Sequence, residues 1–234
     1  MGESNVKLLG WWASPFVLRA RLALRLKSVS YEFIEENLLE PARSELLLKL
    51  NPLYKKIPVL IHDGKPIIES QAIVQYIDEV WPHAPSILPS DARQRADARI
   101  WISYIDDKLV PALIVRLVAE TEDAKRAATA ELEETVAMLE RALRKLSKGK
   151  DFFGGDNIGY LDIAFGPFFL WIEVIDKFNE VKLLSEAKTP SLLRWAHKSF
   201  FSHAAVKDLL PDIEKLAEYA LKFRPILIAR FANK

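Results

Sequence analysis

Two short apolar runs with a turn between them constrain the fold of this chain more than any other local feature. Residues 58–61 and 66–69 form the runs, and the four residues between them contain the dipeptide Asp63-Gly64. An Asp-Gly pair between two apolar runs favours a type I′ turn and therefore a β-hairpin. Each run begins with a proline, at the position where a strand tolerates one. The sequence therefore predicts an antiparallel hairpin here.

The residues around this hairpin predict a small mixed sheet covered by helices. Runs of strand character alternate with runs of helix character along the first eighty residues. The expected order is strand 6–12, helix 16–27, strand 31–36, helix 41–50, the hairpin, and helix 70–80. This β-α-β-α-β-β-α order predicts an α/β domain over residues 1–81.

The rest of the chain predicts an all-helical domain. Residues 81–91 contain three prolines and form the expected linker. Beyond it, one apolar stripe with 4-3-4-3 spacing is typical of an amphipathic helix and consists of Leu132, Val136, Leu139, Leu143 and Leu146. We therefore expect an all-α domain over residues 92–234.

Composition excludes several classes of function. The chain has no cysteine, which excludes disulfides, thiolate metal sites and a cysteine nucleophile. None of its four histidines are paired at helical metal-site spacing, so no metal site is expected. The formal net charge of +1 gives no argument for nucleic acid or an anionic membrane as partner. Without a signal peptide or a spanning segment, a cytosolic location is the expectation.

Ser14-Pro15 has two interpretations. A serine at the N-cap followed by proline at the first helical position is an ordinary helix start. The same serine would also lie at the positive end of a helix, where anions are stabilised and where its hydroxyl could donate to a bound thiolate. No neighbouring histidine makes it a base-activated nucleophile.

Other segments also allow a structural or a functional interpretation. Ile57-Pro58 is either an ordinary proline before a strand or a cis bond whose neighbouring backbone pairs with an extended ligand. Glu69-Ser70 is either a strand end and a cap or a clamp for an ammonium and a carboxylate. Arg43 and Lys56 could supply cations for a second carboxylate. Together these groups suit glutathione, although each alone favours the structural interpretation.

Five stretches carry a family resemblance, namely Trp12-Ala13-Ser14-Pro15-Phe16, Lys55-Lys56-Ile57-Pro58-Val59-Leu60-Ile61-His62, Glu69-Ser70, Val74-Gln75-Tyr76-Ile77-Asp78-Glu79 and Phe153-Gly154-Gly155-Asp156. With these stretches the chain resembles the tau class of plant glutathione transferases along nearly its whole length. The resemblance implies a thioredoxin-like N-terminal domain that binds glutathione, a helical C-terminal domain with a hydrophobic substrate pocket, and a homodimer. It implies glutathione as co-substrate, with no tightly bound cofactor.

The resemblance also implies roles for individual residues. Ser14 becomes the catalytic residue and Pro58 the cis-proline. The glutathione contacts implied are Ser14, Arg43, Lys56, Ile57, Glu69 and Ser70. The hydrophobic pocket implied is Trp12, Phe16, Val110, Ile114, Trp171, Tyr219 and Phe223.

This sequence departs from the family pattern at several places. An Asn-Lys-Ser element usual after the second strand is replaced by residues 41–44, one residue longer, with Arg43 keeping the charge. Val110 and Ile114 stand where relatives often have Tyr and Arg. Gly159 holds a helix cap that is often Ser or Thr. Pro111 falls inside the first long helix of the second domain, where we expect it to kink the helix.

The expected activity is conjugation of glutathione to small hydrophobic electrophiles, and two alternatives stay open. The same thiolate could reduce organic hydroperoxides, which would make the chain a glutathione-dependent peroxidase. A ligandin would keep the pocket and bind hydrophobic metabolites without turnover. Thiol transferase and dehydroascorbate reductase activities are excluded, since those branches use a cysteine where this chain has Ser14.

Overall fold

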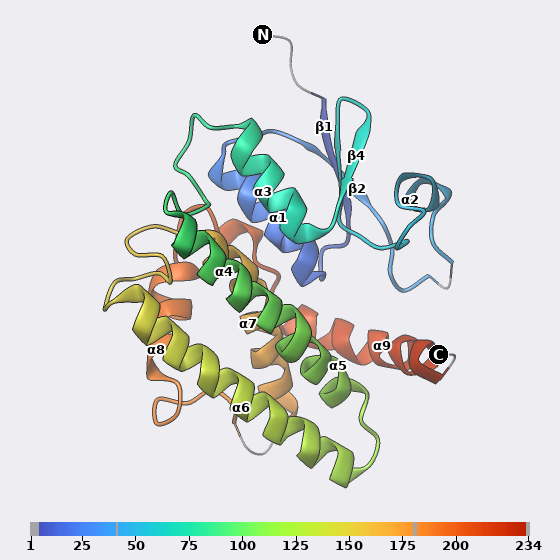
Figure 1. The fold of residues 1–234 in the computed structure, drawn as a ribbon. Coiled ribbons are helices and arrows are strands. Elements are labelled where there is room, and N and C mark those ends of the chain that lie inside the picture. The colour runs from blue at the N-terminus through green and yellow to red at the C-terminus, as the bar shows by residue number, and fades with distance from the viewer. Residues whose placement is uncertain (1–4, 41, 180–181, 233–234) are drawn as a thin grey trace.

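The computed structural model describes residues 5–40, 42–179 and 182–232 (Figure 1). Its first part alternates strands and helices. These elements are β1 (Val6–Gly10), α1 (Pro15–Leu26), β2 (Glu32–Glu35), α2 (Glu45–Leu50), β3 (Val59–His62), β4 (Lys65–Ile68) and α3 (Ser70–Val80). The hairpin prediction is confirmed, since Asp63 and Gly64 both have positive φ, of 49° and 75°, between paired strands.

The four strands form one sheet in the order β2-β1-β3-β4. β1 runs parallel to β2 and antiparallel to β3, and β3 runs antiparallel to β4. The period of two along a strand separates the faces: Leu8 packs with α1 and α3, whereas Leu9 packs with Leu47 of α2. This is the small mixed sheet that the residue pattern predicted, in the thioredoxin-like arrangement that the family resemblance implied.

The first strand is shorter than predicted, for a reason that concerns α1. β1 ends at Gly10, where a β-carbon would lie 2.5 Å from a methyl group of Val17. The glycine therefore lets α1 pack closely on the strand. The chain then turns, and the Ser14 N–H donates to the Trp11 carbonyl at 3.1 Å. α2 is also shorter than predicted, beginning at Glu45 because Ser44 caps it; Pro41 lies outside the described residues.

The second part is helical. Its elements are α4 (Ala92–Tyr104), the π-helical turn η1 (Ile105–Leu109), α5 (Val110–Val118), α6 (Glu122–Ser147), α7 (Tyr160–Phe178), α8 (Pro190–Arg194), the π-helical turn η2 (Trp195–Phe200), the 3₁₀ turn η3 (Lys207–Leu209) and α9 (Ile213–Ala232). α7 is buried on nearly every side and contacts α1 of the first part (Figure 1). In the described part of the chain, no helix combines the length and apolar character that a membrane span requires.

Pro111 produces a wide turn in the helix. The π-helical turn η1 lies directly before α5, and the Val110 N–H donates to the carbonyl of Ile105, five residues back. In a regular α-helix, Pro111 would lack a donor for the Asp107 carbonyl and its ring would clash with that carbonyl. The irregularity is therefore where the sequence predicted it, and it takes the form of one i→i+5 turn.

Candidate functional site

The sheet register brings four predicted site segments to one end of the sheet. Leu9 of β1 pairs with Val59 of β3, and Val59 pairs with Ile68 of β4. Three segments therefore meet at this end: the one that follows β1 and carries Ser14, Ile57-Pro58 just before β3, and Glu69-Ser70 just after β4. β2 runs parallel to β1, so the loop that carries Arg43 also starts there.

Ser14 is the N-cap of α1 and is buried. Its backbone is extended, and its Oγ accepts a hydrogen bond from the Val17 N–H at 3.4 Å. Because the oxygen is the acceptor in this bond, the hydroxyl proton can still be donated to another group. Pro15 at the first helical position adds no N–H. Ser14 thus has the structural role of a cap and keeps a donor at the positive end of the helix.

The first residue of α3, Ser70, is held by a buried arginine that the sequence analysis missed. Arg19 of α1 is 1% exposed, and its Nη1 donates to Ser70 Oγ at 3.2 Å. The same guanidinium forms a bidentate ion pair with Asp106 of η1, with N···O distances of 2.7 and 3.2 Å. Its Nε donates to the Ala164 carbonyl of α7 at 2.9 Å. One side chain therefore connects both parts of the molecule to the start of α3.

Two further contacts complete this network. The side-chain amide of Gln71 donates to Asp106 Oδ2, so α3 and η1 are bonded directly as well. Arg19 also lies over two aromatic rings, 5.3 Å from the centroid of Phe16 and 4.8 Å from that of Phe168. The guanidinium is consequently enclosed by polar partners on one side and by aromatic faces on the other.

Ile57-Pro58 and Glu69 have unusual backbone conformations. The Ile57-Pro58 peptide bond is cis. The preceding segment is held by Asn51, which is 1% exposed and whose amide donates to the Lys56 carbonyl at 2.9 Å. Glu69 has φ of 69°, a left-handed conformation that costs a residue with a side chain about 1–3 kcal/mol. Glu69 and Lys56 have exposed side chains, whereas Ser70 is buried.

Arg43 lies in the loop before α2. It is partly buried, and its Nη1 has no hydrogen-bond partner among the described residues. Next to it, Ser44 is tied to Glu36: the Ser44 N–H donates to Glu36 Oε1 at 3.0 Å and its hydroxyl to Oε2 at 2.5 Å. Glu36 is buried at the end of the sheet. A buried guanidinium nitrogen without a partner is costly, so it is a candidate for binding an anion.

An apolar cavity of about 180 Å³ lies beside Ser14. Of the seven predicted pocket residues, six line it: Phe16, Val110, Ile114, Trp171, Tyr219 and Phe223. Trp12 does not line the cavity. Its ring packs edge-on against the ring of Tyr219, which does line it, with the ring centroids 5.5 Å apart.

The cavity also contains residues that the sequence analysis missed. Five are apolar side chains on the same helices as the predicted ones, namely Leu113, Leu117, Phe168, Ile175 and Leu227. The others are Ala13 and Pro15, which flank Ser14, and Leu38 from the loop after β2. The five helical residues are three or four residues from a predicted pocket residue. Helical periodicity could therefore have found them. No local signal points to Leu38.

Comparisons with known proteins give the family. The model for the glutathione S-transferase N-terminal domain matches residues 4–79, and the model for the C-terminal domain matches residues 122–197. Glutathione S-transferase U17 of Arabidopsis thaliana is 54% identical over 96% of this chain and 98% of its own length. The tau-class glutathione S-transferase of mango, Mangifera indica, superposes with a TM-score of 0.88 at 55% identity, over 93% of this chain and 97% of that one. The chain belongs to the tau class of glutathione S-transferases.

Membership in this class identifies the chain as an enzyme, a glutathione S-transferase. A rice glutathione S-transferase solved in complex with glutathione has a TM-score of 0.85 at 34% identity, over 95% of this chain and 98% of that one. Together with the mango structure, it agrees with the thioredoxin-like and helical parts described above. The polar end of the sheet and the apolar cavity lie where these two parts of the transferase meet.

Proposed function

We propose that this transferase conjugates the thiolate of glutathione to small hydrophobic electrophiles, with Ser14 stabilising the thiolate. One observation carries the proposal: Ser14 caps α1 and also lines the apolar cavity. A thiol with pKa near 8.5 needs only about two units of lowering, roughly 2.7 kcal/mol, to be mainly thiolate at neutral pH. A hydroxyl donor and a helix N-terminus are suited to supply this.

The glutathione site proposed is the polar end of the sheet, in a domain spanning residues 1–81. The backbone of Ile57 pairs with the extended tripeptide, while Ser70 and the start of α3 bind one carboxylate. Glu69 pairs with the ammonium group, and Arg43 and Lys56 face the other carboxylate. Support comes from the buried Arg43 nitrogen, which has no hydrogen-bond partner within the described part of the chain, and from the relative solved with glutathione.

The second substrate is proposed to occupy the apolar cavity, whose walls come mainly from the helical domain, residues 92–234. Once both substrates are bound, the electrophilic carbon lies beside the thiolate, and proximity supplies much of the acceleration. Conjugation is measured by turnover of a chlorinated nitrobenzene, and peroxidase activity is measured by turnover of cumene hydroperoxide. Comparing the two rates would show which activity dominates. A protein that binds both compounds and turns over neither would instead be a ligandin.

The cavity lining predicts selectivity against anionic electrophiles. The helical walls carry no charged side chain among the residues that line the cavity, and a buried unpaired carboxylate is costly. We expect kcat/KM for a carboxylated electrophile to be about tenfold or more below that for its neutral ester. Ile114→Arg should narrow this difference by supplying a cation inside the pocket.

Val115→Arg is the matched control for that variant. Val115 is the next residue of α5, but it is 45% exposed and does not line the cavity. An arginine there should leave the ratio of the two rates unchanged. Equal rates for the carboxylate and its ester in wild type, together with no effect of Ile114→Arg, would contradict the proposed pocket.

We also propose a homodimer in which each N-terminal domain lies against the partner's helical domain. Leu53 and Tyr54 after α2 are 71% and 50% exposed, and Ile100 on α4 is 65% exposed. Such apolar side chains suit an interface. Light scattering at micromolar concentration should give twice the 26.7 kDa of one chain.

A substitution should separate this interface from other exposed apolar residues. Leu53→Glu should shift the protein towards the monomer, because it places a charge in an apolar contact. Leu221→Glu on α9, at a residue that is 57% exposed, should leave the dimer intact. A wild-type monomer at micromolar concentration would be incompatible with the proposed assembly.

A further inference from the structure

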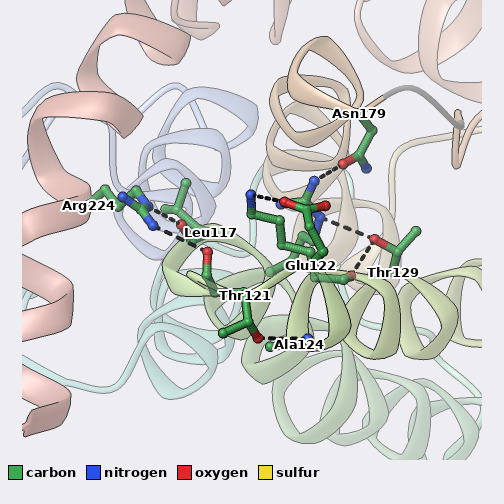
Figure 2. Close-up of polar contacts among 10 residues, drawn as sticks. Leu117, Thr121, Glu122, Ala124, Thr129, Asn179 and Arg224 are labelled. Atoms are coloured by element: carbon green, nitrogen blue, oxygen red, sulfur yellow. Dashed lines mark hydrogen bonds and ion pairs between the residues drawn. The ribbon is translucent and has the colours of Figure 1, made fainter.

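Two helices that face each other across the cavity are joined by one arginine. α5 contributes Val110, Leu113, Ile114 and Leu117 to the cavity, and α9 contributes Tyr219, Phe223 and Leu227. Arg224 of α9 follows directly after Phe223. Its Nε donates to the Leu117 carbonyl at 2.9 Å, and its Nη2 donates to the Ala119 carbonyl at 3.2 Å (Figure 2).

These two bonds satisfy the end of a helix. α5 ends at Val118, and its last carbonyls have no N–H partner within the helix. A guanidinium there also interacts favourably with the negative end of the helix dipole. Because Leu117 lines the cavity, the Arg224 side chain of one pocket wall holds the backbone of the other.

The side chains of α9 become more exposed close to Arg224. Before it, Leu216, Ala217, Tyr219 and Ala220 are buried. From residue 221 to 229, the side chains are partly buried or exposed. Pro225 follows Arg224 and has no N–H to donate to the Leu221 carbonyl, so the helix ladder is interrupted there. The first half of α9 is therefore buried against the rest of the helical part, and the second half follows a turn that lacks one backbone hydrogen bond.

α5, in contrast, is held firmly on its other side. Arg116 donates from Nε to Thr129 Oγ1 of α6 at 3.1 Å, and its Nη2 donates to Asn179 Oδ1 after α7 (Figure 2). Thr129 Oγ1 in turn donates to the Lys125 carbonyl at 2.8 Å. α5 is thus braced by two other helices. Of the two facing walls, α9 is the one whose hydrogen-bond ladder is interrupted within the wall, at Pro225.

We propose that Arg224 is a positioning residue that sets the width of the hydrophobic pocket and, with it, the size of electrophile accepted. The inference rests on the proposed function, since it concerns the same pocket. With Arg224 bonded to α5, the cavity stays narrow and fits small electrophiles. Loss of its bonds lets α9 swing outward from the interrupted turn between Leu221 and Pro225, which contains Arg224. This movement favours bulky electrophiles and loosens the fit of small ones.

S-alkylglutathiones of increasing chain length test the width of the hydrophobic pocket by binding alone, because they do not react. We expect Arg224→Gln to raise the affinity for S-nonylglutathione relative to S-methylglutathione by about threefold to tenfold, the factor that corresponds to one ordinary hydrogen bond. The affinity for glutathione itself should not change, because that site lies at the sheet end. Calorimetric titration measures all three constants, and kcat/KM for a small and a bulky neutral electrophile should shift in the same direction.

Two further variants separate positioning from folding. Lys222→Gln removes an exposed charge from the same helix and should leave the chain-length ratio unchanged. Arg224→Lys keeps the charge but cannot make both bonds in the same geometry, so its ratio should be intermediate. If Arg224→Gln does not fold, Arg224→Lys carries the same comparison.

The outcomes distinguish this inference from the proposed function. An unchanged ratio in the Arg224 variants, or equal losses for every ligand including glutathione, would overturn the positioning role. A wild type that binds S-alkylglutathiones but conjugates no electrophile would contradict the proposed reaction, and the width would still be judged from the binding ratio. A wild type that binds none of these compounds contradicts both.

Discussion

Ser14→Ala should lower kcat by about a hundredfold, the effect of losing one preorganised donor at a developing or bound anion. The fold and the affinity for glutathione should be nearly intact, since Ser14 contributes only a long cap bond to Val17. The pKa of the bound thiol should rise towards the value of a free thiol without reaching it, because the N-terminus of α1 remains. Steady-state kinetics and ultraviolet absorbance of the bound thiolate measure both quantities.

The sign of the pH dependence follows from this shift. In the variant the thiolate fraction at neutral pH is small, and it recovers as the pH rises through the raised pKa. Turnover of Ser14→Ala should therefore recover part of its loss in alkaline solution. Ser14→Thr keeps a hydroxyl that can cap and donate, so it should retain much of the activity.

A cap elsewhere provides the control for Ser14. Asp91 caps α4 by accepting the Gln94 N–H at 2.8 Å. Asp91→Ala should cost about 1 kcal/mol of stability, as the loss of a cap does, and should leave turnover unchanged. If Ser14→Ala behaved like Asp91→Ala, with wild-type turnover and an unchanged pH profile, Ser14 would be a structural cap alone.

Local sequence signals predicted the features that depend on local chemistry. Asp63-Gly64 fixed the hairpin because both positions need positive φ, and Ser14-Pro15 located the start of α1. The starts and ends of elements were less well predicted. β1 ends two residues early because the chain must turn before α1, which depends on the contact between Gly10 and Val17.

Features that depend on distant residues were missed. The sequence around Arg19 indicates only an ordinary arginine in a helix, since its neighbours in α1 are good helix formers. Its partners Ser70, Asp106 and Ala164 lie 51, 87 and 145 residues away, so only the packed structure shows that it is buried. Leu38 was missed for the same reason: it reaches the cavity from a loop without periodicity.

Replacing Arg19 should have the largest effect on stability. Arg19→Met removes both bonds to Asp106 and the bonds to Ser70 and Ala164, and it leaves a carboxylate without its main partner. Breaking a buried ion pair in this way typically costs about 3–5 kcal/mol; Asp106 is 22% exposed, which favours the lower end. Urea unfolding measures the cost. The KM for glutathione should rise as well, because Ser70 loses the donor that orients it.

Variants of the neighbouring Arg21 and of the partner Asp106 are the controls for this prediction. Arg21→Met, in the same helix, removes a partly exposed bond to the Tyr31 hydroxyl and should cost less than about 1 kcal/mol. If the unpaired charge causes the loss, the double variant Arg19→Met with Asp106→Leu should be more stable than the sum of the single variants predicts. Additive losses, or equal effects at Arg19 and Arg21, would mean that Arg19 stabilises the fold by packing alone. A KM for glutathione that stays constant in all these variants would contradict the idea that Arg19 orients Ser70 for glutathione binding.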